Sequence, residues 1–394
     1  MIPFNIPYSS GKETARMQEA QALGHIAGNG HFTRLCGIAA ERLFGYKPVF
    51  FTPSCTSALT MAALLCDLRP GDEVILPSFT HPGTANAFLL AGATLRFADC
   101  GPDQPNIDPL SVSRLIGPRT RVLVVVHYAG VACDMAAFRG IAGRHGLWLI
   151  EDAAHAIGAR FGDEWLGSQG DMAAFSFHET KNITCGQGGM LVVNRPELES
   201  RAREIWQQGT NRWDFEQGAV PHYTWTRTGG AFLLPDLNAA YLYPQLCSVN
   251  EINAGRMERW RQYYETLLPL QEEGLFRLPQ VPVYAWHNAH IFHLLAATPS
   301  LRDGLIAHLN RLGIQAVFHY IPLHSSPHGG YSQEDAPLPY ADDLASRIVR
   351  LPLYNRLSLD EVGRISGAVL EWAFKNSTYH HGTQFTPRPR PLHP

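Results

Sequence analysis

The chain has 394 residues, of which 45% are hydrophobic and 17% charged, a composition typical of a compact soluble enzyme. Its formal net charge of -3 gives no electrostatic reason to expect a nucleic acid or an anionic membrane as a partner. The 7 cysteines include no CxxC pair, which indicates reduced thiols and a cytoplasmic location. The N-terminus lacks the pattern of a signal peptide, and the longest branched-aliphatic run, Val122–Val126, is too short to span a membrane.

The first part of the chain alternates between strand and helix patterns. Residues 1–46 read as an irregular lead-in followed by helical segments, and the alternation begins at Pro48. The predicted strands are Val49–Thr52, Glu73–Phe79, Thr94–Asp99, Val122–His127, Leu147–Ile150 and Met172–Phe177. The predicted helices between them are Ser54–Asp67, Thr84–Leu90, Asp108–Ile116 and Met135–His145. Apolar strands separated by helices predict an α/β fold with a mostly parallel central sheet covered on both faces.

The pattern changes after Asn194. Residues 196–208 read as a helix, 209–230 as an aromatic-rich loop, and one long helix is expected from Asp236 to about Leu268. Further strand-like pieces are His290–Ala296 and Gln315–Phe318, and further helices Arg302–Leu312 and Leu359–Phe374. We therefore expect a large domain, a smaller C-terminal α+β domain and a disordered tail rich in Pro and His, over residues 1–250, 251–376 and 377–394.

The stretch from Leu147 to Asn194 has a spacing that suits pyridoxal phosphate (PLP). Asp152 follows one predicted strand, whereas Ser176 and Lys181 lie at the end of the next. Parallel strands end at one edge of a sheet, so these side chains are expected to meet there. A lysine amine forms the Schiff base with PLP, and an acid partners its pyridine nitrogen. A helix-capping aspartate and a solvated lysine are the structural alternatives.

Two further features would complete a PLP site. Thr56 and Ser57 open a helix after a strand, where hydroxyls, free N–H groups and the helix dipole suit a phosphate, although they also fit an ordinary N-cap. His155 could contact the pyridine ring or its phenolic oxygen, or be structural.

A metal site is the competing use of the 18 histidines. His287, His290 and His293 repeat every three residues, but in a strand-like segment this spacing does not converge on one ion. We therefore expect no metal.

Motifs spread over about residues 1–376 resemble the DegT/DnrJ/StrS family of PLP-dependent sugar aminotransferases. They are Ser54–Leu59, Pro70–Ile75, Pro77–Thr80, Thr84–Ala87, Glu151–His155 and Ser176–Asn182. The resemblance implies a fold-type I PLP-dependent aminotransferase that works as a homodimer with shared active sites. It implies ping-pong transfer of an amino group from L-glutamate to C4 of a nucleotide-linked 4-keto-6-deoxy sugar.

The resemblance also assigns roles to individual residues. Lys181 becomes the catalytic lysine, held as an internal aldimine, and Asp152 the partner of the pyridine nitrogen. The residues expected to bind the cofactor are Thr56, Ser57, His81, Asp152, His155 and Ser176. The residues expected to contact the substrate are Asn86, His319 and Tyr320.

Other motifs resemble the subgroup that converts dTDP-4-keto-6-deoxyglucose to dTDP-4-amino-4,6-dideoxygalactose, a precursor of surface polysaccharides such as lipopolysaccharide. They are His127–Cys133, Gly209–Arg212, Tyr223–Trp225 and Phe318–His324. The chain departs from the family at Gln187, where relatives have Glu, and at His81, where they have Phe or Trp. It departs again at Ala231, where many relatives carry an asparagine that reaches the phosphate in the partner subunit.

Two other functions are compatible with the same fold. One is a PLP-dependent deoxysugar dehydratase, whose relatives carry histidine in place of the lysine. The other is a non-catalytic regulator that binds PLP or a sugar nucleotide. Lys181 argues against the dehydratase, and Lys181 together with Asp152 argues against the regulator.

Overall fold

The computed structural model describes residues 1–46, 48–102, 104–328 and 337–377. Its centre is a seven-stranded sheet in which β11 is antiparallel to both neighbours and the remaining pairs are parallel. In spatial order the strands are β1 (Val49–Thr52), β11 (Gly189–Val193), β10 (Met172–Ser176), β7 (Trp148–Asp152), β6 (Thr120–Val126), β2 (Glu73–Pro77) and β3 (Thr94–Ala98). The mostly parallel sheet predicted from the apolar strands is confirmed.

Both faces of this sheet are buried because neighbouring residues of a strand point to opposite sides. Val74 and Val122 pack with α3, α4 and α7, whereas Ile75 and Leu123 pack with α2, α6 and α9. The helices on the first face are α3 (Cys55–Leu65), α4 (Pro82–Leu89) and α7 (Glu199–Trp206). Those on the second are α2 (His31–Phe44), α6 (Met135–His145) and α9 (Asp236–Cys247).

The start of α2 is fixed by an acid from a distant part of the chain. The two carboxylate oxygens of Asp236 accept hydrogen bonds from the backbone N–H groups of Phe32 at 3.1 Å and Thr33 at 2.8 Å. A Cβ at Gly30 would lie 2.4 Å from Cγ of Asp236, so the close approach requires glycine. This contact joins the N-terminal helices, including α1 (Glu13–Ala22), to α9.

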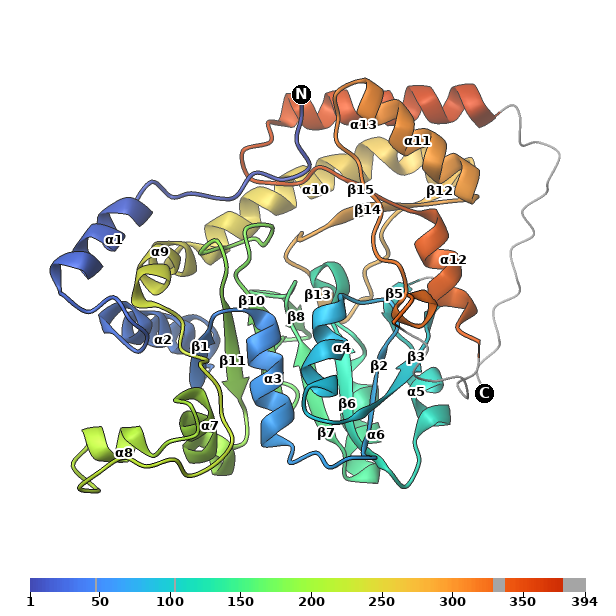
Figure 1. Cartoon of the computed structure of the whole chain (residues 1–394). Helices are drawn as coiled ribbons and strands as arrows, with labels where there is room; N and C mark the ends of the chain where they lie inside the picture. Colours follow the sequence, from blue (N-terminus) through green and yellow to red (C-terminus); the bar gives the residue numbers. More distant parts are fainter. Residues whose placement is uncertain (47, 103, 329–336, 378–394) are drawn as a thin grey trace.

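The C-terminal elements form a second core around the antiparallel sheet β12 (Phe276–Arg277), β14 (Phe292–Ala296) and β15 (Ile348–Leu351). They lie above the central sheet in Figure 1. The helices around this sheet are α10 (Val249–Glu272), α11 (Pro299–Arg311), α12 (Pro339–Arg347) and α13 (Leu359–Ser377). Ile2 joins this core and bridges Ile314, so the N-terminus packs on the C-terminal part. The proposed domain division stays a prediction.

Shorter α-helices and strands lie between these elements. They are α5 (Pro109–Leu115), α8 (Arg212–Glu216), β4 (Cys100–Gly101), β5 (Gln104–Ile107), β8 (Arg160–Phe161), β9 (Glu164–Trp165) and β13 (Ala285–Trp286). None of the described helices has both the length and the apolar character needed to cross a lipid bilayer.

Three local predictions were wrong. The long helix expected from Asp236 is two helices, because the chain leaves helical geometry at Ser248 (φ -106°, ψ 12°). This break lets α9 pack on α1 and α2 while α10 packs on α13. The segment 209–230 contains the helix α8, and 315–318 forms no strand, only an isolated bridge from Val317 to Arg350. Of the predicted tail, 378–394 lies outside the described residues, and Ser377 ends α13.

Candidate active site

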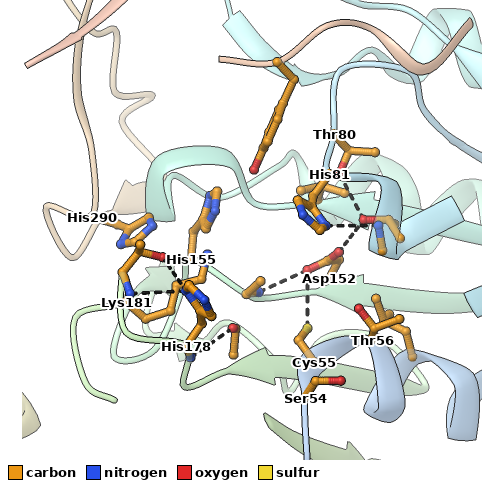
Figure 2. A pocket seen from close by; sticks show the side chains of 18 of the residues that line it. Ser54, Cys55, Thr56, Thr80, His81, Asp152, His155, His178, Lys181 and His290 are labelled. Carbon is orange, nitrogen blue, oxygen red and sulfur yellow. Dashed lines mark hydrogen bonds between the residues drawn. The ribbon is translucent and has the colours of Figure 1, made fainter. Parts of the chain in front are cut away.

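A cavity of about 350 Å³ opens at the carboxyl-terminal edge of the central sheet, where it meets the C-terminal elements. Figure 2 shows Lys181 and His290 on one side of it, and Asp152 on the other side, above Ser54 and Thr56. The predicted site residues that line it are Thr56, His81, Asp152, His155, Ser176, Lys181, His319 and Tyr320. Ligands of open α/β sheets bind at this edge.

Asp152 is the last residue of β7, and its carboxylate is buried and fixed by neighbours. Oδ2 accepts a hydrogen bond from the Thr84 hydroxyl at 2.8 Å, and Oδ1 accepts one from the Ala154 backbone N–H at 3.1 Å. The Cys55 thiol lies 4.0 Å from Oδ1. Asp152 is the only acid among the described residues that line the cavity. A fixed, buried carboxylate in this position suits a protonated pyridine nitrogen.

Lys181 follows β10 in a turn. Its backbone N–H donates a hydrogen bond to the His178 carbonyl at 2.9 Å. Among the described residues, its amine has no hydrogen-bond or ion-pair partner. Burial is the main cause that lowers the pKa of Lys181 from 10.5 to about 8. An amine of this kind is neutral, and therefore nucleophilic, in a substantial fraction of molecules near neutral pH.

The first turn of α3 faces the cavity opposite Lys181. Ser54 caps this helix, because its Oγ accepts a hydrogen bond from the Ser57 backbone N–H at 3.0 Å. The Ser57 hydroxyl lies 2.9 Å from that same oxygen and does not line the cavity, whereas Thr56 and Ser176 do. A Cβ at Gly189 would lie 2.4 Å from the Ser54 carbonyl carbon, so β11 approaches this turn too closely for a side chain.

His155 follows Asp152 in a segment without regular secondary structure. The chain forms turns there, and His155 is buried in one of them. Its Nδ1 accepts a hydrogen bond from the Ala129 N–H at 3.3 Å, and its ring lies 4.3 Å from the His290 ring. Burial holds the pKa of His155 well below its usual value, so this imidazole is neutral.

Of the remaining predicted residues, His81, His319 and Tyr320 line the cavity, whereas Asn86 does not. His81 caps α4, where its Nδ1 accepts a hydrogen bond from the Gly83 N–H at 3.0 Å, and its side chain is exposed at the cavity mouth. His319 Nδ1 lies 3.0 Å from the Tyr128 hydroxyl. Asn86 is on the exposed side of α4 and does not line the cavity, so the geometry offers no direct contact for it.

Sequence reasoning missed several residues of this site. They are Phe4, Cys55, Thr80, Thr84, His290 and Arg350. Thr84 begins the family-like motif Thr84–Ala87, which indicates no role for the single residue, and Arg350 has no local signal because it belongs to an ordinary apolar strand. In the described ranges, no group of three or more His, Cys, Asp and Glu side chains is arranged to hold a metal ion.

The residues present fit PLP. A partnerless amine, a carboxylate held by two hydrogen bonds, and hydroxyls at a helix N-terminus are the groups that its aldehyde, pyridine nitrogen and phosphate require. The model of the DegT/DnrJ/EryC1/StrS aminotransferase family matches residues 9–370. The chain belongs to this family.

Solved structures of aminotransferases resemble this family member over nearly its whole length. The aminotransferase TlmJ from Streptoalloteichus hindustanus is 29% identical, with a TM-score of 0.87 over 95% of this chain and 99% of that one. S. venezuelae DesV, solved in complex with a ketimine intermediate, is 31% identical, with a TM-score of 0.83 over 92% and 94%. NtdA from Bacillus subtilis, with bound cofactor PMP, is 25% identical, with a TM-score of 0.83 over 92% and 82%.

These comparisons settle the fold and the class of enzyme. The chain has the fold of the type I PLP aminotransferases, and it is a PLP-dependent sugar aminotransferase of the DegT/DnrJ/EryC1/StrS family. The expected family, fold class, enzyme class and cofactor are therefore confirmed.

Proposed function

We propose that the enzyme transfers an amino group from L-glutamate to C4 of dTDP-4-keto-6-deoxyglucose and so makes dTDP-4-amino-4,6-dideoxygalactose. The observation that carries the amino-transfer chemistry is that Lys181 and Asp152 line the same cavity (Figure 2). The motifs Tyr223–Trp225 and Phe318–His324, which resemble the subgroup with this substrate, support the choice of sugar. In this proposal the reaction takes place in the cytoplasm, and its product is a precursor of a surface polysaccharide.

Each group in the cavity has one task in this proposal. Bound PLP supplies an aldehyde that carries the amino group and a ring that withdraws electrons from the reacting carbon. Lys181, once released from the cofactor, moves a proton at the substrate carbon, and Asp152 keeps the pyridine nitrogen protonated. Thr56 and Ser176, which line the cavity, would bind the phosphate, and the neutral His155 would contact the ring.

We place the enzyme in a homodimer whose active sites are shared. The segment 209–230 carries aromatic side chains that lie in solvent within a single chain: Trp225 is 79% exposed and Tyr223 52%. Side chains of this size and rigidity are common in protein interfaces. Light scattering on the purified protein is expected to give twice the mass of one chain.

Isotope transfer tests the proposed reaction directly. The protein, PLP, ¹⁵N-labelled L-glutamate and dTDP-4-keto-6-deoxyglucose are incubated together, and the sugar product is analysed by NMR. The expected product carries ¹⁵N at C4 with an axial amine, and a Lys181→Ala variant makes none. An equatorial amine would change the product assignment. Absence of ¹⁵N from the sugar would refute the proposed acceptor.

A further inference from the structure

His290 lies on the same side of the cavity as Lys181 (Figure 2). It is buried, and it belongs to the segment that leads into β14. The guanidinium of Arg256, from α10, holds the backbone of this segment. Its Nε donates a hydrogen bond to the Ala289 carbonyl at 3.0 Å, and one of its terminal N–H groups donates to the His290 carbonyl at 2.8 Å. The position of the His290 ring is therefore fixed from the backbone outward.

The hydrogen bonds around His290 show which ring nitrogen carries the proton. The Ile157 carbonyl can only accept, so the amide group of Asn253 that faces it at 3.0 Å is the NH₂ group, and Asn253 Oδ1 is an acceptor. That oxygen lies 2.8 Å from the NH₂ group of Asn182, which also donates to the Asn288 carbonyl at 2.9 Å. Oδ1 of Asn182 is therefore the atom that lies 2.8 Å from His290 Nδ1. Because this oxygen accepts, the proton of the imidazole is on Nδ1.

The second ring nitrogen of His290, Nε2, is left with a lone pair. Burial is the main cause that holds the pKa of His290 well below its usual value, and the positive charge of Lys181 adds to it, so the ring is neutral. Among the described residues, Nε2 has no hydrogen-bond partner. Since the side chain lines the cavity, this acceptor is available to a ligand there.

The neighbouring ring of His155 has the opposite tautomer. Its Nδ1 accepts the hydrogen bond from the Ala129 N–H, so its proton is on Nε2. The two rings lie 4.3 Å apart. The pair of histidines therefore offers one donor, on His155, and one acceptor, on His290. The phenolic oxygen of PLP suits the donor, which leaves the acceptor for another group.

The partner of His290 Nε2 has to be a group that donates. Bound PLP offers phosphate and phenolic oxygens, which accept, and its pyridine N–H is directed to Asp152. The carboxylates of the amino donor also accept, and its nitrogen reacts with the cofactor. The Lys181 amine makes no hydrogen bond with His290. A hydroxyl of the acceptor sugar is the donor that remains.

The place of His290 beside Lys181 selects one hydroxyl of that sugar. Asn182, which bonds the His290 ring, is the next residue after Lys181 in the chain. The acceptor is therefore near the carbon at which Lys181 moves a proton, which is C4 in the proposed reaction. Of the two carbons bonded to C4, C5 carries a methyl group and C3 carries a hydroxyl. The C3 hydroxyl is thus the donor nearest to the reacting carbon.

We propose that His290 Nε2 accepts a hydrogen bond from the C3 hydroxyl of the acceptor sugar, so that the enzyme selects 4-keto sugars with a free hydroxyl next to the reacting carbon. This inference rests on the sugar acceptor of the proposed function. It makes His290 a residue that determines specificity. The proton transfer itself stays with Lys181.

The test compares two acceptors that differ by this hydroxyl alone, dTDP-4-keto-6-deoxyglucose and dTDP-4-keto-3,6-dideoxyglucose. The enzyme is first converted to its amine form with L-glutamate, and the return of the absorbance band of Lys181-bound PLP is followed at several concentrations of each sugar. The wild type is expected to need an about 10-fold higher half-saturating concentration of the 3-deoxy sugar, because the acceptor in the cavity is then left unpaired.

Amide side chains of two lengths separate the two ring nitrogens of His290. In His290→Asn the NH₂ group reaches the place of Nδ1 and keeps the bond to Asn182, but no atom replaces Nε2. In His290→Gln the longer amide brings its oxygen to the place of Nε2. The preference for the 3-hydroxy sugar is expected to fall to within about twofold in His290→Asn and to stay at about fivefold in His290→Gln. A purely structural role through Asn182 predicts the opposite order.

A matched control changes a histidine outside the cavity. His308 lies on α11 with its ring 6.4 Å from the Trp372 ring, and His308→Asn is expected to keep the wild-type preference. Circular dichroism checks folding, and His290→Ala, which lacks both nitrogens, carries the test if His290→Asn does not fold.

Two outcomes would overturn the inference while the proposed function stands. One is a wild-type enzyme that reacts equally well with both sugars, and the other is a preference that His290→Asn keeps and His290→Gln loses. A wild-type enzyme that reacts with glutamate but with neither sugar would instead refute the proposed acceptor, and the inference on His290 would be refuted with it.

Discussion

The Thr84 hydroxyl of α4 donates a hydrogen bond to the carboxylate of Asp152, at the end of β7, over 2.8 Å. The Thr80 hydroxyl lies 3.0 Å from that of Thr84, and the Ala154 N–H bonds the other carboxylate oxygen. The acid is thus oriented by protein groups on both of its oxygens. A carboxylate held in this way needs little rearrangement to meet the pyridine nitrogen of PLP.

Replacement of Thr84 by Val removes this hydrogen bond at nearly constant volume. A hydrogen bond to a charged group contributes about 1.5–3 kcal/mol, so PLP affinity is expected to fall by about 10- to 100-fold. Thr84→Ser, which keeps the hydroxyl, is expected to stay within about threefold of wild type. The dissociation constant of PLP, measured by absorbance titration of cofactor-free protein, checks this. Equal affinities for Thr84→Val and wild type would show that Asp152 needs no such support.

The capture of PLP is expected to depend on pH through Lys181. The pKa of Lys181, lowered from 10.5 to about 8 chiefly by burial, means that its reactive neutral form increases as pH rises through 8. About one tenth of the amines are then neutral at pH 7, against less than about one thousandth for an ordinary lysine. The rate of PLP binding to cofactor-free protein, followed by absorbance from pH 6 to 9.5, should rise and level off above 8. A rise that continues to pH 9.5 without a plateau would contradict the lowered value.

Thr56 and Ser57 are expected to differ in their effect on the cofactor. Thr56 lines the cavity, whereas the Ser57 hydroxyl is occupied by Ser54 at 2.9 Å. We expect Thr56→Val to weaken PLP binding by about 10-fold and Ser57→Ala by less than about threefold. Titration of both variants with PLP, and with pyridoxal as a probe without phosphate, makes the comparison. Equal losses in the two variants would mean that Ser57 turns toward the phosphate on binding.

Asp236 is expected to matter for stability rather than catalysis. Asp236→Ala leaves the N–H groups of Phe32 and Thr33 without a partner inside the protein, which should cost about 2–4 kcal/mol of unfolding free energy. Asp108→Ala, which removes the N-cap of α5, is the control and should cost about 1 kcal/mol. Urea denaturation of both variants gives the two values, and equal values would show that the Asp236 contact contributes no more than an ordinary cap.

The central sheet was accessible from the sequence because β2, β6, β7 and β10 each contain an apolar run of at least three residues. The same patterns placed Asp152, Ser176 and Lys181 at one edge, and the structure brings these three together. The break at Ser248 was missed although Pro244, a residue that disfavours a helix interior, lies four residues before it; on the two sides of the break the helices pack on different partners.

The other wall of the cavity could not be predicted from local patterns. His290 and Arg350 come from the C-terminal elements, and the docking of these elements on the large sheet decides that they face Lys181. His290 was considered only as a metal ligand, although its Nδ1 lies 2.8 Å from Asn182 Oδ1. Likewise, the spacing of residues in the sequence does not reveal that the Ser57 hydroxyl lies beside Ser54 Oγ and does not line the cavity.

The two half-reactions of the purified enzyme test the central claim most directly. PLP bound to Lys181 absorbs near the visible edge, and L-glutamate is expected to replace this band by that of the amine form. Addition of dTDP-4-keto-6-deoxyglucose should then restore the first band, and Lys181→Ala should show neither change. Loss of the band with glutamate and no return with the sugar would contradict the proposed acceptor. A Lys181→Ala variant with an unchanged spectrum would contradict the role of Lys181 itself.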